Sequence, residues 1–328
     1  MTKNILLAAA VAAAAAFNAC ASAQSYPSTN DGTGSTVYFT SEISPEALVN
    51  IFEALGVQPQ GNVAVKISTG ESQKTHHLDP MLIKDLVQKV NGTLVEANTL
   101  YKGSRGDTET HYKAIAERGY DKIAPVEILD ATDTIHIAVV DDKWIHYDIV
   151  GANLPKYDFM INLAHFKGHQ MGGFGGVLKN ASIGVASAAG KAYIHSAGQT
   201  ESGWGNPDQD AFLESMAAAA QAVHNYFKQP GKDIVYINVM NNMSIDCDCN
   251  GNPDAPLVQN MGILASTDPV ALDKACLDLV FAHESSAGDD SEPLKERINS
   301  RHGTHTVEYA ETIGLGTTHY TLVKIDEK

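Results

Sequence analysis

The segment NPDQDAFLESMAAAAQAVHNYF, residues 206–227, followed by DIVYINVM, residues 233–240, decides the fold. The first part opens with Asn-Pro and repeats apolar residues at helical spacing, which predicts an amphipathic helix. The second part is a continuous apolar run of strand length. A helix that leads into a buried strand is typical of parallel sheets, whose two faces are both covered by helices.

The same alternation of strand and helix extends in both directions along the chain. We expect strands near residues 37–40, 62–68, 93–97, 126, 135–140, 144–149, 157–163, 261–265 and 320–325, and helices at 44–55, 79–90, 108–118, from 268 onwards and twice more before the last strand. These elements predict an α/β fold in which a mostly parallel mixed sheet is flanked by helices. The sheet belongs either to a single intertwined unit or to two closely packed lobes that meet near residue 150.

The N-terminus has the pattern of an export signal. Lys3 provides the positive charge, residues 5–17 form an unbroken run of 13 apolar residues, and Ala21-Ser22-Ala23 is a cleavage site of small residues. We therefore expect residues 1–23 to be a signal peptide, and the mature protein to lie in the periplasm or on the outer surface.

Beyond the signal, the sequence predicts a short leader and one folded region. Residues 24–36 are rich in Ser, Thr, Gly, Asn and Pro, which is typical of a flexible leader, and residues 37–328 contain the α/β domain. Cys20 offers a second mode of export, in which the mature chain carries a lipid. No run of 18 or more apolar residues follows the N-terminal segment, so we expect membrane attachment only through that lipid.

The charge balance excludes several classes of function. The chain has 328 residues, with 39 Asp and Glu against 23 Lys and Arg, a formal charge of −16. A surface this negative repels phosphate backbones, so we expect no nucleic-acid partner. The dinucleotide-binding pattern fails because Leu178 stands where Gly173 and Gly175 would need a third glycine, and residues 185–192 lack the first Gly and final Ser or Thr of a P-loop.

The stretch after the strand at 157–163 has an unusual charge pattern. Residues 159–200 are 42 positions without a single Asp or Glu, and they include three Lys and three His. In sheets of this class, ligands bind beyond the carboxyl ends of strands. Closely spaced glycines let backbone N–H groups approach an anion, and a helix starting near Gly175 would add to that preference. We therefore expect a site for a small anionic ligand, with His165, Lys167, His169 and Lys179 in catalysis and Gly173, Gly175, Gly176, Lys191, His195 and, from an earlier loop, Arg105 in binding.

The pair Cys247 and Cys249, in the sequence IDCDCNG, is a second candidate for chemistry. Two thiolates at this spacing can bind one soft metal, Zn or Fe, with His165 and His169 as further ligands. A disulfide between them is the alternative in an exported protein. The adjacent carboxylates raise the pKa of a thiol, which disfavours free nucleophiles here. Cys276 lies in an apolar helical stripe and is expected to be a buried hydrophobic residue.

Several of these segments together resemble a known family, the uncharacterised Fe–S centre proteins of domain of unknown function 362. The resemblance rests on the motifs HFKGH, GGFGGVLKN, AGK, NTLYKGSR, DCDC and GILASTDPVA, which occur between about residues 62 and 316. Many members of that family carry a ferredoxin-like four-cysteine segment after the counterpart of His195. Residues 195–206, HSAGQTESGWGN, contain no cysteine, so the resemblance does not imply that 4Fe–4S cluster.

Three functions remain open on this sequence. The first is an exported enzyme whose metal-assisted site acts on a small anionic substrate by an unknown, conceivably redox, reaction. The second is a non-catalytic accessory protein that binds a metal or an Fe–S cluster. The third is a small-ligand binding module in which Cys247 and Cys249 form only a structural disulfide.

Overall fold

The computed structural model describes residues 34–325, so the expected signal peptide and most of the leader lie outside the described residues. Within this range the chain forms an eight-stranded sheet of order β12-β1-β11-β10-β7-β2-β3-β4. Its strands are β1 (Ser35–Thr40), β2 (Val63–Lys66), β3 (Thr93–Glu96), β4 (Val126–Ile128), β7 (Phe159–His165), β10 (Asp233–Met240), β11 (Gly262–Ser266) and β12 (Tyr320–Lys324). Strands from both sides of residue 150 therefore share one sheet.

The sheet is mostly parallel, as the alternating pattern predicted. Strands β4, β3, β2, β7 and β10 are parallel neighbours, and β12 is parallel to β1. β11 pairs antiparallel with both β10 and β1. The α/β fold with a mixed, mostly parallel sheet is confirmed.

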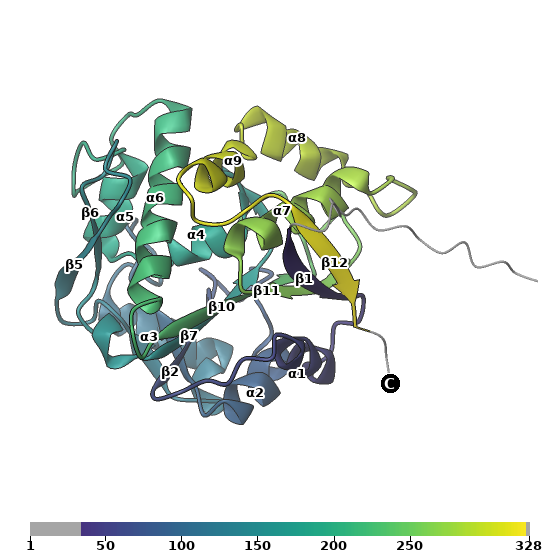
Figure 1. Cartoon of the computed structure of the whole chain (residues 1–328), viewed down its shortest axis with the longest axis horizontal. Helices are drawn as coiled ribbons and strands as arrows, with labels where there is room; N and C mark the ends of the chain where they lie inside the picture. Colours follow the sequence, from purple (N-terminus) through teal and green to yellow (C-terminus); the bar gives the residue numbers. More distant parts are fainter. Residues whose placement is uncertain (1–33, 326–328) are drawn as a thin grey trace, which may run out of the picture.

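Helices cover both faces of the sheet (Figure 1). One face packs against α1 (Pro45–Ala54), α2 (Pro80–Lys89) and α3 (Thr108–Arg118), and the other packs against α4 (Val177–Ala181), α6 (Gln209–Phe227) and α7 (Pro269–Ala282). The strands between these layers are almost entirely buried. In residues 34–325 no helix combines the length and apolar character needed to cross a membrane.

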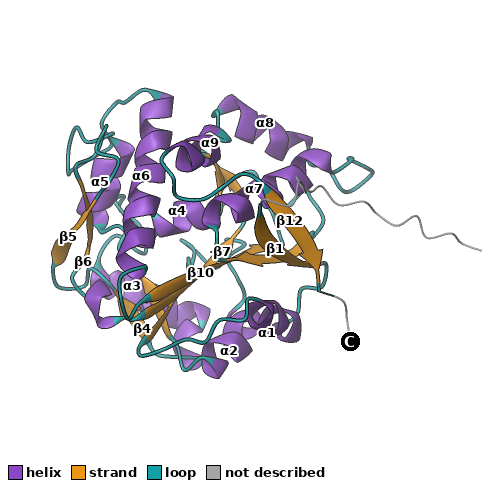
Figure 2. Cartoon of the chain, viewed as in Figure 1, coloured by secondary structure: helices purple, strands orange, loops and turns teal. Residues whose placement is uncertain are grey.

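A smaller unit packs against one end of α6 (Figure 2). It comprises the antiparallel pair β5 (Thr134–Ala138) and β6 (Tyr147–Gly151) together with α5 (Ala188–His195). The two strands lie further apart in the chain than the expected 135–140 and 144–149. The polar DDK sequence after Val140 belongs to the connecting loop, and Val140 itself is 70% exposed. The remaining strands and α-helices of the described range are the short pair β8 (Lys167–His169) and β9 (Gly173–Gly175), with α8 (Glu292–Ser300) and α9 (His305–Thr312).

Among the strand boundaries that differ from the expected ones, two are explained by pairing with a neighbouring strand. β1 starts at Ser35, inside the expected leader, because Ser35 and Thr36 pair with β12. β7 continues to His165, because its pairing with β10 runs on to Val239. The chain leaves β2 toward β3 and β4, whereas it leaves β7 toward β10. The carboxyl ends of β2 and β7 thus flank the point where the strand order reverses, which is where ligands bind in such sheets.

Candidate functional site

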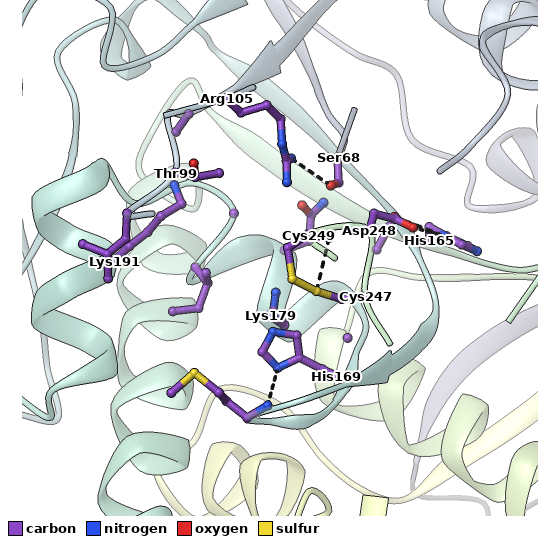
Figure 3. A pocket seen from close by; sticks show the side chains of 18 of the residues that line it. Ser68, Thr99, Arg105, His165, His169, Lys179, Lys191, Cys247, Asp248 and Cys249 are labelled. Carbon is purple, nitrogen blue, oxygen red and sulfur yellow. Dashed lines mark hydrogen bonds and ion pairs between the residues drawn. A yellow bond between two sulfur atoms is a disulfide. The ribbon is translucent and has the colours of Figure 1, made fainter. Parts of the chain in front are cut away.

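A cavity of about 290 Å³ opens at this reversal point (Figure 3). Its wall combines the segment from β7 to α5, the loops after β2 and β3, and the loop that contains both cysteines of the pair. The lining residues include His165, Lys167, His169, Gly175, Gly176, Lys179, Lys191, His195, Arg105, Cys247 and Cys249. The structure therefore brings every residue proposed for the site into one pocket except Gly173.

The pocket is positively charged in a protein that is acidic overall. Its lining contains five Lys or Arg side chains and two carboxylates, although the whole chain has a formal charge of −16. The carboxylates are Glu96 and Asp248, and the cations are Lys66, Arg105, Lys167, Lys179 and Lys191. An excess of fixed positive charge in a partly enclosed cavity favours an anionic ligand.

Asp248 connects the histidine–lysine segment to the cysteine loop. Its carboxylate accepts a hydrogen bond from Lys167 Nζ at 2.5 Å and contacts His165 Nδ1 at 3.1 Å. All three side chains are buried. Burial alone would raise the pKa of Asp248, but Lys167 and His165 hold it well below its usual range. Asp248 is therefore ionised. Together with Lys167 and His165 it forms a buried group of three, the Asp248 triad.

The ring of His165 has an acceptor at each nitrogen. Nδ1 faces the ionised Asp248, and Nε2 lies 2.6 Å from the carbonyl oxygen of Asn241. Neither partner is a hydrogen-bond donor, so acceptor oxygens hold the ring from both sides. Both ring nitrogens of His165 are thus engaged in contacts within the protein. Its expected role as a metal ligand or acid–base group stays a prediction.

Glu96, the second carboxylate of the lining, is likewise paired with two cations of the pocket. It forms ion pairs with Lys66 at 3.1 Å and with Arg105 at 3.3 Å, and Arg105 also contacts Glu71 at 3.2 Å. Burial would raise the pKa of Glu96, but Lys66 and Arg105 keep it below its usual range. Arg105 borders the cavity, yet its guanidinium is already paired with carboxylates, so it is less available for a ligand than the sequence predicted.

Lys179, on α4, is the pocket cation without a compensating acid. Among residues 34–325 no carboxylate lies within ion-pair distance of its ammonium group. Burial, followed by the nearby charges of Lys167, Arg105 and Lys191, lowers the pKa of Lys179 to about 7. Lys191, on α5, donates to the carbonyl of Ala186 at 2.5 Å, and burial lowers its pKa to about 8.

His169 and His195 are neutral, and they differ in which ring nitrogen carries the hydrogen. Nδ1 of His169 accepts hydrogen bonds from the backbone N–H groups of Gly172 (2.8 Å) and Met171 (3.3 Å), so its hydrogen is on Nε2. Nδ1 of His195 donates to the carbonyl of Lys191 at 2.7 Å, so its Nε2 is an acceptor. Burial lowers the pKa of His169 well below its usual range and that of His195 to about 4.

The glycines of the segment serve different purposes. A Cβ on Gly175 would lie 3.6 Å from Lys179 and 3.9 Å from Lys167, so this glycine keeps space open between two cations. A Cβ on Gly176 would collide with Asp273, whose carboxylate accepts from the first two N–H groups of α4 at 2.9 Å each. The expectation that this helix N-terminus binds the ligand was wrong, because Asp273 already occupies it. Gly173, with φ of 80°, packs against Gly303 and does not line the cavity.

The cysteine loop is held against the pocket by backbone contacts. Gly168 N–H donates to the carbonyl of Ser244 at 2.9 Å, and a Cβ on Gly168 would lie only 2.2 Å from the carbonyl oxygen of Ile245. The close approach places Cys247 and Cys249 in the wall, where they form a disulfide. The third cysteine in the described range, Cys276, is free and buried, as predicted.

The structure also tests the predicted metal ligands. His169, Cys247 and Cys249 offer ligand atoms that lie within 4.8 Å of one another, so a metal can be accommodated geometrically. Two disulfide-bonded sulfurs are not thiolate ligands, however. The donor set therefore fits a metal only when the disulfide is reduced. It does not fit a four-cysteine cluster, since Cys276 is buried beside Asn238 and the chain has four cysteines in all.

Several pocket residues were missed by the sequence analysis. Lys66 and Glu96 end two neighbouring parallel strands, β2 and β3, and this position could have identified them. Asp248 was considered only for its effect on the thiols. Trp204, which meets the ring of His195 edge-on at 5.1 Å, comes from an irregular loop that gave no signal.

The fold and the pocket define an α/β protein with a cation-lined cavity at the carboxyl edge of a mostly parallel sheet. The chain belongs to the family described as domain of unknown function (DUF362), whose model matches residues 63–278. The resemblance recognised in the sequence is therefore confirmed. A comparison with proteins of curated function gave no match.

Two solved structures show distant similarity to this chain. A protein from Thermotoga maritima is 14% identical with a TM-score of 0.44, and the match covers 71% of this chain and 57% of that one. The lactate racemase apoprotein from Thermoanaerobacterium thermosaccharolyticum is 13% identical with a TM-score of 0.37, covering 63% and 50%. This chain thus matches between half and three-fifths of the length of either protein.

The Asp248 triad leads to a prediction about stability. Asp248→Asn leaves Lys167 and His165 buried without their counter-charge, which we expect to cost about 3–5 kcal/mol of unfolding free energy. Urea denaturation measures this loss. The control is Asp233→Asn, which removes an exposed partner of Lys228 and should cost about 0–1 kcal/mol. Equal effects of the two substitutions would contradict the structural role of Asp248.

The disulfide leads to a prediction about metal content. Protein purified without reductant should contain far less than one equivalent of Zn or Fe, because its two candidate sulfur ligands are joined to each other. Elemental analysis of the wild type beside Cys247→Ser measures the metal. A full equivalent in the unreduced wild type that disappears in Cys247→Ser would show that thiolates, not a disulfide, occupy the site.

Proposed function

We propose that this protein is exported and binds a small anion in the cation-lined pocket, where neighbouring lysine and histidine side chains exchange protons with it. The observation that carries this proposal is Lys179, an enclosed ammonium group without an acidic partner in residues 34–325. The export signal of residues 1–23 supports the location, and the charge of the lining supports the ligand class.

The arrangement of ion pairs supports an external partner for Lys179. Asp248 and Glu96 are already shared by Lys167, His165, Lys66 and Arg105. An unpaired charge that is only partly accessible to solvent costs stability, and an anionic ligand between Lys179 and Lys191 would offset that cost. The volume of about 290 Å³ is at the lower end of the range for small-molecule sites, which favours a small organic anion.

The neutral groups of the pocket are suited to acid–base chemistry. His169 Nε2 carries a hydrogen to donate, and His195 Nε2 has a lone pair to accept one. Lys179, with a pKa of about 7, is present in both protonation states near neutral pH. These three groups give a bound anion one donor, one acceptor and one side chain that changes charge.

The disulfide favours a second candidate function, the small-ligand binding module. With Cys247 and Cys249 oxidised, the pocket offers an anion cations and hydrogen bonds but no thiolate-held metal. In that case binding is the function, and the metal-assisted form of the proposal applies to the reduced protein. Both candidates require anion binding, which is therefore the first property to measure.

Replacing Lys179 tests anion binding directly. We expect malonate to bind the wild type and malonamide, its neutral analogue, not to bind. Lys179→Met should weaken malonate binding by about 2–5 kcal/mol, as for other truncated buried charge pairs, while raising stability by about 0.5–2 kcal/mol. Isothermal titration and urea denaturation provide the two measurements.

The matched control is Lys113→Met, which removes an exposed lysine on α3 whose side chain is 65% accessible. This variant should bind malonate as the wild type does. If malonate binds Lys179→Met as tightly as the wild type, or if malonamide binds equally well, the pocket is not an anion site.

The pKa of Lys179 predicts how binding depends on pH. An anion stabilises the ammonium form, so binding raises the pKa of Lys179 above its value of about 7 in the free pocket. Affinity should therefore be greatest below pH 7 and should fall above it, by up to about tenfold per pH unit. Titrations between pH 6 and 9 in buffers of different ionisation enthalpy would reveal the proton uptake, and a flat profile would exclude Lys179 as the coupled group.

A further inference from the structure

The Cys247–Cys249 disulfide lies in the wall of the pocket rather than in the core. Both cysteines line the cavity, and Figure 3 shows the disulfide among the charged side chains with His169 close by. Cys247 is only 3% exposed, whereas Cys249 is partly exposed. A bound ligand would therefore reach the sulfur of Cys249 first.

The carboxylates beside the cysteines are neutralised by contacts that the sequence did not reveal. Asp248 is paired with Lys167 and His165. Asp246 accepts from Arg297 at 2.9 Å and from the Asn250 side chain at 3.0 Å. The adjacent acids therefore oppose thiolate formation less than the sequence alone suggests, and the surrounding lysines favour thiolates.

The two sulfurs are not equivalent. The backbone N–H of Cys249 donates to Cys247 Sγ at 3.3 Å. His169 lies near both sulfurs and does not distinguish them. Hydrogen-bond donors stabilise negative charge on sulfur, and a better-stabilised thiolate leaves faster in disulfide exchange. Cys247 is thus the better leaving group and Cys249 the better target.

We propose that the Cys247–Cys249 disulfide is redox-active and exchanges with small anionic thiols that bind in the pocket. The inference rests on the anion binding proposed above. The bound thiolate attacks Cys249 Sγ, the bond between the two cysteine sulfurs breaks, and its electron pair goes to Cys247 Sγ. The products are a mixed disulfide on Cys249 and a Cys247 thiolate.

A second equivalent of the anionic thiolate completes one turnover. It attacks the ligand sulfur of the mixed disulfide and releases a symmetric disulfide together with the Cys249 thiolate. Two thiols lose two electrons in total, the protein disulfide gains them, and the cysteine thiolates take up protons from solvent. No other oxidant is needed for this single turnover.

The experiment compares two thiols of similar size on the oxidised, folded wild type. 3-Mercaptopropionate is anionic, and 2-mercaptoethanol is neutral. At equal thiolate concentration, we expect the anionic thiol to react about tenfold faster or more, within the range of electrostatic steering. Samples quenched with iodoacetamide should carry the mercaptopropionate adduct on Cys249 and the alkyl group on Cys247, while buried Cys276 stays unmodified.

Three controls test whether the thiol reacts with the disulfide from within the pocket. Malonate should slow mercaptopropionate and leave mercaptoethanol unaffected. Lys179→Met should bring the two rates together, and Lys113→Met should keep them apart. Equal rates in the wild type, an adduct mainly on Cys247, or no reaction until the protein is unfolded would each overturn the proposal.

The malonate titration distinguishes a failure of the disulfide-exchange proposal from a failure of the proposed function. If malonate binds but the disulfide does not react, the pocket is an anion site with an inert disulfide, and only the exchange is wrong. If malonate does not bind and both thiols react equally, the anion site itself is wrong.

Discussion

The contact on which the site depends is the one between Asp248 and the side chains of Lys167 and His165. Asp248 is more than eighty positions from Lys167 and His165 in the chain. Its carboxylate nevertheless lies 2.5 Å from Lys167 Nζ and 3.1 Å from His165 Nδ1, in a buried environment. Because a buried carboxylate is costly without counter-charges, the triad fixes the cysteine loop against the carboxyl end of β7. One ion triad therefore determines which side chains share the pocket.

The ion pairs of the pocket also determine the electrostatic field inside it. Asp248 and Glu96 are fully used by nearby cations, so neither is left to balance Lys179. Burying cations is unfavourable for the folded chain. Burial lowers the pKa of Lys179 and of Lys191, and for Lys179 the nearby cations add to the effect. Under the proposed function, an anion that enters the pocket would offset this cost, so the same cations that lower the stability of the fold would provide the binding free energy.

The sequence predicted the framework well because it depends on local patterns. The helix at 108–118 and the strand at 233–240 have the expected limits, since caps and apolar periodicity are local properties. The acid-free window correctly drew attention to Lys179 and His195 as residues of one pocket. The contact between Gly176 and Asp273 was missed because the two residues are almost a hundred positions apart, and no spacing rule could pair them.

The cysteine pair shows most clearly why such long-range pairing limits prediction. In the sequence, each cysteine is next to an acid, and formal charge alone predicts thiols that resist ionisation. In the fold, Arg297 neutralises Asp246, while Lys167 and His165 neutralise Asp248. The sulfurs therefore experience the charge of the pocket rather than that of their sequence neighbours. Whether they act as a disulfide or as metal ligands then depends on their oxidation state, because one pair of sulfurs cannot do both at once.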